Sequence, residues 1–417
     1  MYLVINSGSS SIKFKLFDNC KKLQKIVKNC KNKKEDLEEI MSGIVEKIWH
    51  NDSFLDWKFG DKEWRIEDNF GDYQIALEEI LATIKVCGIK LNDIKAVWHR
   101  VVHWWERFNK SVIIDAKVIK TIRECEELAP IHNKVNLECI LDCKKLLPKA
   151  KQIAVFDTAF GQSMEEENYI YAIPYKYYKK YKIRKYGFHG ISHEFVYNKL
   201  IQNLKKSSGT SFIKEAKVKK DLKVITCHVG NGASISAIKN GKVIQNSMWM
   251  TPLEWLIMWT RSWDIDPAII PFLMKRENLT ADQVENILNK ESGLKWLWWK
   301  SGDMRDIRTA YIKWDPKAEM IIKMYVNRII KYIWAYTALL WWLDAIVMTA
   351  WVLERSQLIR KLICERLDWI GVKIDNKKNK ESLKEWEISS KDSKVKVWVI
   401  PTNEELMIAE EMMKVIK

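Results

Sequence analysis

The amino-terminal stretch, residues 1–18, carries a pattern of apolar and polar positions that predicts a β-hairpin. Leu3–Ile5 form a short apolar run, residues 6–11 are small and polar, and residues 12–16 alternate apolar side chains with lysines. Such a pattern indicates a buried strand, a tight turn and a half-exposed strand. The N–H groups and hydroxyls of this turn, followed by Lys13, suit an anionic phosphate, although an ordinary Ser/Gly hairpin turn contains the same residue types.

A second stretch repeats this pattern about 220 residues later. Residues 223–242 again give an apolar strand, a Gly-Asn-Gly turn, small hydroxyl residues and an alternating strand. They end in Asn240-Gly241, a dipeptide typical of hairpin turns. We therefore expect a duplicated domain in which each half offers a phosphate-binding hairpin to a shared cleft.

The remaining periodicity predicts helices and strands in alternation, which places the chain in the α/β class. The expected helices are residues 35–48, 73–86, 118–128, 135–147, 251–258, 281–288, 318–343, 356–367 and 403–416, and one that begins at Ser192. The expected strands outside the hairpins are residues 94–102, 152–156, 345–349 and 395–400. Because 417 residues are too many for one core, we expect two domains, 1–150 with a closing helix at about 401–417, and 151–400.

Composition is that of an ordinary soluble globular protein, since 47% of the residues are hydrophobic and 30% are charged, and the cysteines and the amino terminus described next favour the cytoplasm. The amino terminus lacks the basic and long apolar segments of a signal peptide. The longest apolar run, residues 332–343, is too short to span a bilayer, so we expect no membrane association. The eight cysteines include no CxxC pair and are expected to be reduced, buried thiols.

The net charge of +16 raises nucleic-acid binding as an alternative. Aromatic and basic residues do interleave in residues 175–186. The lysines nevertheless gather in separate clusters typical of loops and solvated helix faces, and an anionic substrate explains the charge equally well. We therefore do not expect nucleic acid as a partner.

Polar residues at predicted strand ends and in Gly-flanked loops are the candidates for chemistry. They are Asn6, Lys13, Arg100, His132, Asp157, His189, His228, Asn231, Arg261, Asp303, Arg305 and Glu404. Each alone is commonly a helix cap or a local hydrogen-bond partner. Together, two phosphate turns with arginines, histidines and carboxylates, and without a nucleophilic triad, favour phosphoryl transfer assisted by Mg²⁺.

Motifs along nearly the whole chain resemble those of the acetokinase (acetate kinase) family, in family order. The matching stretches are VINSGSSSIKFKLFD, HRVVH at 99–103, ELAPIHN at 127–133, VFDTAF at 155–160, YGFHGISH at 186–193, CHVGNGASISAIKNGK at 227–242, TPLE at 251, TRSWDIDPAIIPF at 260, SGDMRDI at 301, LDAIV at 343 and PTNEELMIA at 401.

The resemblance implies two duplicated ribonuclease-H-like domains of the actin-like, sugar-kinase superfamily, with a cleft between them. It also implies reversible transfer of a phosphoryl group from ATP to acetate, giving acetyl phosphate and ADP by direct in-line transfer. The expected cofactor is Mg²⁺, with Mn²⁺ as a substitute, and the expected assembly is a homodimer. A propionate or butyrate kinase is the alternative within the same class.

The resemblance also implies roles for individual residues. Catalysis would fall to Asp157, Arg100, Arg261 and His189, with Arg261 and His189 stabilising the transition state and His132 as a secondary site residue. Asn6 and Glu404 would serve the metal. Arg100, Val102, Ile131, Phe188 and Pro252 would contact acetate. The nucleotide would lie against Lys13, His228, Val229, Gly230, Asn231, Gly232, Asp303, Met304, Arg305, Trp351, Val352, Leu353, Glu354 and Arg355.

Tryptophan stands at many positions where the family has glycine. These are Trp98, Trp104, Trp105, Trp249, Trp255, Trp259, Trp263, Trp296, Trp299, Trp334, Trp341, Trp342 and Trp351. The chain has 21 Trp and 15 Gly, whereas an average of about 7% glycine predicts roughly 29. Random drift would spread changes over many residue types.

We therefore hypothesise that many of these codons are UGA, which the source organism reads as glycine. The alternative is real substitution, which would make the chain a degenerate, non-catalytic nucleotide-binding protein with indoles filling its cleft. Trp369 lies at a position where the family has tryptophan. Leu353 and Arg355 replace a Gly and an Asn of the family's adenine-side loop, and no codon reading of tryptophan explains those two changes.

Overall fold

The structure is a computed structural model that describes residues 1–8, 10–19, 37–101, 110–125, 130–206, 221–253, 256–299, 303–381 and 385–416. The chain divides into two compact units. Unit 1 comprises residues 1–159 and 403–417, and unit 2 comprises residues 160–402. The long carboxyl-terminal helix therefore belongs with the amino-terminal part of the chain.

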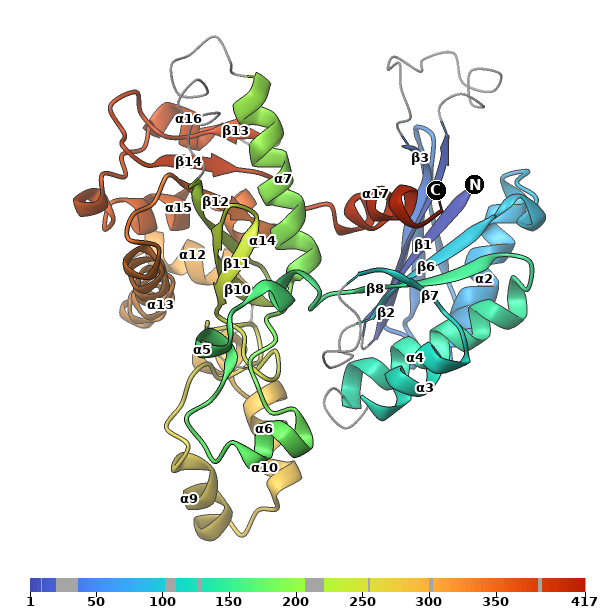
Figure 1. Cartoon of the computed structure of the whole chain (residues 1–417), viewed down its shortest axis with the longest axis horizontal. Helices are drawn as coiled ribbons and strands as arrows, with labels where there is room; N and C mark the ends of the chain where they lie inside the picture. Colours follow the sequence, from blue (N-terminus) through green and yellow to red (C-terminus); the bar gives the residue numbers. More distant parts are fainter. Residues whose placement is uncertain are drawn as a thin grey trace. The chain divides into compact units, whose positions relative to one another are not determined.

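Unit 1 is built on an eight-stranded sheet with the order β5-β4-β3-β2-β1-β6-β8-β7 (Figure 1). The strands are β1 (Tyr2–Ser7), β2 (Ser11–Asn19), β3 (Leu37–Glu46), β4 (Phe54–Phe59), β5 (Lys62–Glu67), β6 (Ala96–Val101), β7 (Val112–Ile113) and β8 (Lys151–Phe156). Strands β1, β6 and β8 run parallel, and β2 to β5 form an antiparallel meander on β1.

The first predicted hairpin is confirmed, because β1 and β2 pair antiparallel with Asn6 opposite Lys13. The turn between them is closed by a hydrogen bond of 2.8 Å from the Gly8 N–H to the Ser11 carbonyl. The Tyr73 hydroxyl, from helix α2 (Tyr73–Val86), donates to the Gly8 carbonyl and anchors this turn on the unit's own core.

The helix predicted at residues 35–48 is wrong, because residues 37–46 form strand β3. Apolar residues there recur at intervals of three and four, which imitates one face of a helix. The segment instead pairs with β2 and β4, and Gly43 allows it to lie close to them: a Cβ at this position would come within 2.5 Å of the Phe14 ring and 2.6 Å of the Asp56 carbonyl. Strands β4 and β5 were not predicted at all.

Helices cover both faces of the unit 1 sheet. They are α2 (Tyr73–Val86), η1 (Leu91–Asp93), α3 (Ala116–Glu124), α4 (Pro130–Leu146) and α17 (Glu404–Ile416). Helices α2 and α4 pack on one face, and α17 contacts β1, β2 and β6 on the other (Figure 1). Since side chains alternate along a strand, neighbouring residues of β6 face different helices.

Unit 2 contains a six-stranded sheet with the order β11-β10-β9-β12-β14-β13 (Figure 1). The strands are β9 (Lys223–Val229), β10 (Ala233–Lys239), β11 (Lys242–Asn246), β12 (Ala345–Thr349), β13 (Trp386–Glu387) and β14 (Lys396–Val399). The second predicted hairpin is confirmed by the antiparallel pairing of β9 with β10 and of β10 with β11.

The two sheets share a five-strand core. In unit 1 the core order is β3-β2-β1-β6-β8, and in unit 2 it is β11-β10-β9-β12-β14. In both, three antiparallel strands are followed by two strands parallel to the first strand of the hairpin. The predicted α/β fold with a duplicated, ribonuclease-H-like domain is confirmed.

Two helices of unit 2 cover its sheet. Helix α7 (Gly190–Lys206) packs on β9 and β12, and helix α13 (Pro316–Leu340) packs on β9 and β10. The helices of unit 2 are η2 (Phe160–Ser163), α5 (Glu166–Tyr169), α6 (Lys176–Tyr181), α7 (Gly190–Lys206), α9 (Ile269–Arg276), α10 (Ala281–Lys290), α11 (Gly293–Trp298), α12 (Met304–Ile312), α13 (Pro316–Leu340), α14 (Ala350–Arg355), α15 (Gln357–Cys364), η3 (Asp368–Ile370) and α16 (Asn376–Lys380). Because helices cover both faces, every residue of β12 is buried.

The helix predicted at residues 251–258 is wrong for its described residues, 251–253 and 256–258, none of which is helical. The backbone of this segment forms hydrogen bonds with another part of the chain: the Met258 carbonyl accepts from the Leu294 N–H, at the start of α11, at 2.9 Å. Among the described residues, no helix has both the length and the apolar character needed to cross a bilayer.

Candidate active site

The carboxyl ends of the parallel strands of unit 1 bring three of the predicted site residues together. Asn6 lies near the end of β1, Arg100 near the end of β6, and Asp157 follows β8 directly. Because these strands run parallel, their carboxyl ends meet at one edge of the sheet, where ligands bind in α/β folds.

An ion pair forms the centre of this group. The Arg100 guanidinium donates from Nη2 to Asp157 Oδ2 at 2.9 Å and from Nη1 to Asn6 Oδ1 at 3.5 Å. Asp157 is buried, with a side-chain exposure of 1%, and Arg100 is 18% exposed. Burial opposes the charge of Arg100, but the Asp157 and Glu404 carboxylates outweigh it and raise the arginine's pKa. The Arg100 Nε is buried and has no acceptor among the described residues.

Glu404 joins this group from the first turn of α17. Burial raises the pKa of its carboxyl group to about 7, against the opposing effect of Arg100. A raised carboxyl pKa means that the cations already present do not compensate a negative charge at this place. The Glu404 carboxylate and the Asn6 amide oxygen are hard donors, the type Mg²⁺ prefers, so these residues fit the predicted metal.

The start of α17 is held by a residue that the sequence analysis did not single out. Lys15, on β2, donates from Nζ to Asn403 Oδ1 at 3.2 Å, and it lies 3.0 Å from Glu39 and 3.9 Å from Glu405. Lys15 alternates with Lys13 along β2, and Lys13 acts on Glu404 through its charge. The alternation of Lys13 and Lys15 along the predicted hairpin was the sequence feature that could have indicated the contact of Lys15 with Asn403.

Unit 2 places a network of imidazoles and hydroxyls at the corresponding ends of its strands. The His189 and His228 rings stack with their centroids 4.2 Å apart. The Ser234 hydroxyl lies 2.9 Å from His189 Nδ1 and 2.7 Å from His193 Nε2. His193 Nδ1 is 2.7 Å from the Thr226 hydroxyl. Burial, with the nearby charge of His228, lowers the pKa of His193 well below its usual value, so this ring is neutral.

This network continues through the Ser192 hydroxyl, which lies 2.7 Å from His228 Nδ1 and 2.7 Å from the Thr402 hydroxyl. Ser192, His193, Ser234 and Thr402 were not among the predicted site residues. The motif around His189 contains Ser192 and His193, and the hydroxyls of the second hairpin contain Ser234, so the sequence held a signal for these three residues. Their contact could not be foreseen, because it depends on the packing of α7 against β9 and β10.

The predicted nucleotide turn, residues 229–232, follows β9 beside His189. A Cβ on Gly232 would come within 3.0 Å of His189 Nε2, so glycine allows the turn to approach the ring. The N–H of Gly230 donates to the Gly232 carbonyl at 2.9 Å and closes the turn. Val229 is buried at the end of β9, and the Asn231 carbonyl accepts from the Trp259 N–H at 3.3 Å.

Arg261 is positioned by the segment that contains Pro252. Its Nη1 donates to the Pro252 carbonyl at 2.8 Å and lies 3.6 Å from Met258 Sδ. Burial lowers the pKa of this arginine, which marks a cation without full compensation. Gly293 allows the start of α11 to lie close to this segment, since a Cβ on Gly293 would lie 2.4 Å from the Met258 carbonyl. Phe188, a predicted acetate contact, is buried before α7.

Several predicted nucleotide residues of unit 2 line one cavity of 280 Å³. Its lining consists of Met304, Arg305, Arg308, Trp351, Val352, Arg355 and Ser356. Asp303 caps α12 and pairs with Arg305, whose guanidinium lies 5.4 Å from the Trp351 ring centroid. The hydrogen bond from Arg305 lowers the pKa of Asp303. The cavity is therefore rich in guanidinium groups and suits an aromatic, anionic ligand.

Glu354 and Leu353 do not line this cavity. Glu354 Oε1 accepts from the Ala350 N–H at 2.7 Å and the Thr402 N–H at 3.0 Å, which ties α14 to the end of β14. Leu353 is fully buried, and its carbonyl accepts from Arg360. Val102 and the side chains of Ile131 and His132 lie outside the described residues.

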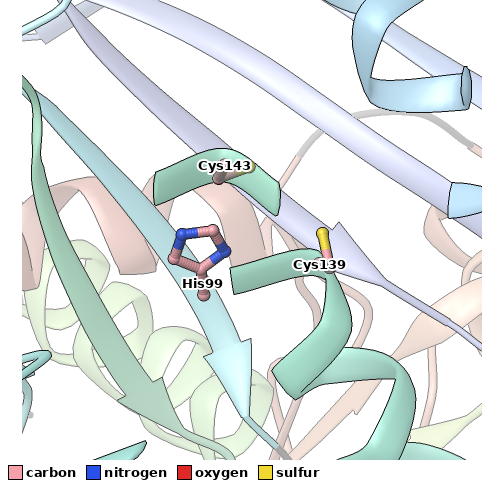
Figure 2. A group of neighbouring side chains, drawn as sticks. All are labelled: His99, Cys139 and Cys143. Atoms are coloured by element: carbon pink, nitrogen blue, oxygen red, sulfur yellow. The ribbon is translucent and has the colours of Figure 1, made fainter. Parts of the chain in front are cut away.

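A further cluster lies in unit 1 on the face of β6 opposite to Arg100. His99, Cys139 and Cys143 are fully buried, and one donor atom from each lies within 4.8 Å of the others (Figure 2). The two cysteines are one turn apart on α4. A hydrogen bond from Cys143, helped by His99 and Ser7 and opposed by burial, lowers the pKa of Cys139 to about 6. Soft donors of this kind could hold a metal ion, but not Mg²⁺.

Comparisons with known proteins agree with the motifs. The family model described as "Acetokinase family" matches residues 1–410. The acetate kinase of Treponema denticola is 46% identical to this chain, with 100% of this chain and 99% of that protein covered. The acetate kinase of Thermotoga maritima is 45% identical, with 100% and 98% covered.

Solved structures give the same result. The acetate kinase of Porphyromonas gingivalis superposes with a TM-score of 0.85 at 38% identity, and the match covers 100% of this chain and 99% of that one. A propionate kinase from Francisella tularensis superposes with a TM-score of 0.87 at 35% identity, and the match covers 100% of both chains.

Proposed function

This chain belongs to the acetokinase family, and from that premise we propose that it catalyses reversible phosphoryl transfer between ATP and acetate. A carboxylate oxygen of acetate would attack the γ-phosphorus, and the bond from that phosphorus to the β–γ bridging oxygen would break. The products are acetyl phosphate and ADP. Such a reaction depends on positioning and charge stabilisation more than on covalent chemistry.

The single observation that carries this proposal within the chain is the group of Arg100, Asp157, Asn6 and Glu404. A buried guanidinium with an unused Nε–H donor among the described residues can bind a small carboxylate. Asp157 fixes the orientation of that guanidinium through the 2.9 Å ion pair. Asn6 and Glu404 would hold Mg²⁺ or Mn²⁺, which neutralises charge on the phosphates when bound.

We propose that unit 2 supplies the nucleotide contacts and the stabilisation of the transferred group. The turn at residues 229–232 and the cavity between α12 and α14 would bind the phosphates and the base of the nucleotide. His189, which is held at Nδ1 by Ser234, would donate from Nε2 to an equatorial phosphoryl oxygen. Arg261, whose charge lacks full compensation, would bind the same phosphoryl group.

Substrate size is a finer proposal. The family resemblance implies that Val102, Ile131, Phe188 and Pro252 contact the methyl group of acetate, and apolar contacts of this kind distinguish one methylene by only about 1–3 kcal/mol. The similarity to a propionate kinase at 35% identity supports a propionate or butyrate kinase as the second candidate. A comparison of kcat/KM for acetate, propionate and butyrate distinguishes the candidates.

The direct test is an acyl-phosphate trapping assay with ATP, Mg²⁺ and acetate, in which hydroxylamine converts the product to a hydroxamate. We expect a product that depends on all three components. No hydroxamate at saturating substrate, from protein with glycine at the tryptophan positions discussed below, would contradict the proposal and favour a non-catalytic nucleotide-binding protein.

We also propose, on the family resemblance alone, that the chain forms a homodimer in the cytoplasm. Light scattering coupled to gel filtration should give twice the chain mass of 49.3 kDa. A mass equal to one chain at micromolar concentration would contradict the dimer.

A further inference from the structure

Left-handed backbone conformations in this protein are occupied by tryptophan to an unusual extent. Eleven non-glycine residues in the described part of the chain have a positive φ, and five of them are tryptophan. The five are Trp49 (φ 73°), Trp263 (φ 99°), Trp299 (φ 45°), Trp314 (φ 63°) and Trp341 (φ 61°). This conformation is unfavourable for a bulky L-residue, whereas glycine adopts it without a steric penalty.

Three of the five lie where helices end. Trp341 caps α13 and donates its N–H to the Ala338 carbonyl at 3.0 Å, and Trp299 caps α11 with a 2.9 Å bond to the Lys295 carbonyl. Trp314 follows α12, with a 3.0 Å bond to the Tyr311 carbonyl. A residue in the left-handed region at this place is usually glycine, because the chain must reverse sharply there.

Solvent exposure removes the hydrophobic benefit of the indole at two of these helix ends. Trp314 is 87% exposed and Trp341 is 90% exposed, so neither ring gains hydrophobic free energy that would offset the backbone strain. The ring of Trp299 differs, because the Lys317 ammonium lies 3.4 Å from its centroid.

Trp98 differs from these exposed tryptophans, because its side chain is buried in the core. It lies on β6 between Val4 of β1 and Ile153 of β8, and it is fully buried. Its indole N–H is buried and has no acceptor among the described residues, although buried tryptophans normally find one. A residue without a side chain would leave no unsatisfied donor at this position.

We propose that glycine is the natural residue at Trp98 and at the five left-handed positions, because their codon, UGA, is read as glycine in the source organism. Trp369 is the internal contrast. It is 88% exposed, as Trp314 and Trp341 are, but it lies within η3 and is not among the residues of positive φ. Trp369 should therefore be encoded by UGG. This proposal stands on backbone geometry at the five left-handed positions and on the unsatisfied indole N–H at Trp98, and it does not depend on the proposed function.

Codon sequencing and peptide mass spectrometry of the protein purified from its source organism test the proposal directly. We expect UGA and a glycine mass at Trp98, Trp314 and Trp341, and UGG with a tryptophan mass at Trp369. Peptides that carry tryptophan at all four positions would overturn the proposal, as would UGG codons throughout.

Recombinant variants test the physical argument independently. Trp314→Gly and Trp341→Gly should each raise the Tm, by about 2–4 °C, because glycine relieves the strain of the left-handed conformation. Trp369→Gly is the matched control, equally exposed but unstrained, and it should leave the Tm unchanged or lower it. A lower Tm for both Trp314→Gly and Trp341→Gly would contradict the proposal.

A second, independent observation concerns the His99, Cys139 and Cys143 cluster. The Gln152 side chain donates from Nε2 to the Ala150 carbonyl at 3.2 Å, so its Oε1 faces His99 Nε2 at 2.8 Å as an acceptor. His99 therefore carries its proton on Nε2, and Nδ1 keeps the lone pair that a metal requires. Metal-binding histidines are commonly oriented by such a bond at the other nitrogen.

We infer that this cluster binds one soft metal ion of the Zn²⁺ type through His99 Nδ1 and the two thiolates. Both sulfur atoms come from one turn of α4, and all three donors are buried within 4.8 Å of one another (Figure 2). Zinc takes imidazole and thiolate ligands, and binding would release the thiol protons to solvent. The family resemblance implies no metal at this place.

Protein expressed with added zinc and then desalted should retain one zinc per chain in elemental analysis. Cys139→Ser and Cys143→Ser should lose this zinc, whereas Cys125→Ser, which changes another buried cysteine of unit 1, should keep it. Circular dichroism identifies variants that fail to fold, and Co²⁺ substitution should give a thiolate charge-transfer band in the wild type. Zinc-free wild-type protein without such a band would overturn this inference, as would equal zinc in folded Cys139→Ser.

Discussion

The two copies of the five-strand core carry different chemistry at corresponding strand ends. In unit 1 the ends of β1, β6 and β8 carry charges, namely the Arg100–Asp157 pair and the nearby Glu404. In unit 2 the ends of β9 and β10 carry a network of imidazoles and hydroxyls, in which the buried His193 is neutral. The order of the five core strands is the same, so the difference in chemistry comes from the side chains at their ends and from the segments that each unit adds to the core.

Under the function proposed above, this difference would let each half of a duplicated fold contribute a different part of one reaction. A charged, partly compensated group suits a small carboxylate and a hard cation, whereas a neutral network beside a Gly-rich turn suits the oxygens of a phosphate. The comparison predicts that substitutions in unit 1 act mainly through charge and that substitutions in unit 2 act mainly through hydrogen bonding.

The largest effect is expected from Arg100→Ala. This change removes the guanidinium that would hold acetate and the phosphoryl group, and it leaves Asp157 buried without its partner. We expect kcat/KM for acetate to fall by about 10³-fold. Hydroxamate formation measures the activity, and thermal unfolding measures the accompanying loss of stability.

Arg65→Ala is the matched control for Arg100→Ala. Arg65 makes the same kind of ion pair, with Asp56 at 2.6 Å, but at an exposed position on strands β4 and β5 of the same unit. Its loss should leave activity and Tm nearly unchanged. Arg100→Lys, which keeps the charge but loses the two-pronged geometry, should fold and remain far less active than wild type. Activity of Arg100→Lys close to wild type would refute the assignment.

The corresponding change in unit 2, His189→Gln, should lower kcat by about 10²-fold with little change in the KM for ATP. The glutamine can still contact Ser234, so the network should persist while the donor aimed at the phosphoryl oxygen is lost. Steady-state kinetics separate the two parameters. The exposed His50→Gln serves as the control, and a rise in KM alone would assign His189 to nucleotide binding instead.

Much of this architecture could be predicted from the sequence because it rests on local patterns. The hairpins at β1–β2 and β9–β10 follow from alternation and Gly-rich turns, and α2 was predicted with the bounds it has, Tyr73–Val86. Strand β3 could not be predicted, because its apolar spacing imitates a helix, whereas its strand conformation depends on pairing with β2 and β4, where Gly43 allows close packing.

In the candidate site, too, some residues could be predicted from local sequence and others depended on tertiary packing. Arg100 and Asp157 could be proposed from motifs, since each stands at the end of a predicted strand. The contacts of Lys15 with Asn403 and of Ser192 with Thr402 could not, because each joins residues more than two hundred positions apart. Pairings over such distances depend on tertiary packing, which local periodicity does not encode.

A smaller effect is expected from the pH dependence of stability. Burial lowers the pKa of His193 below its ordinary value of 6.5. As the pH falls below 6.5, His193 therefore becomes protonated in the unfolded state while it stays neutral in the folded state. The stabilisation is therefore present above the unfolded pKa and is lost as the pH falls, by up to about 1.4 kcal/mol per pH unit. Between pH 7.5 and 5.5, His193→Gln should lose less Tm than wild type. Parallel Tm curves for the two proteins would show that His193 can be protonated in place.

The smallest effect is expected from Arg305→Ala, at the cavity between α12 and α14. Arg305 is 66% exposed, so solvent screens its charge, and an exposed ionic contact with a nucleotide phosphate is worth about 0.5–1 kcal/mol. The KM for ATP should therefore rise only about two- to five-fold, with kcat unchanged. Lys180→Ala, which removes another exposed cation of unit 2 that does not line this cavity, should change neither parameter. If Arg305→Ala instead lowered kcat as strongly as His189→Gln does, the cavity would belong to the reacting centre. Unit 2 would then act through charge as well as through hydrogen bonding, and the contrast between the two halves would be wrong.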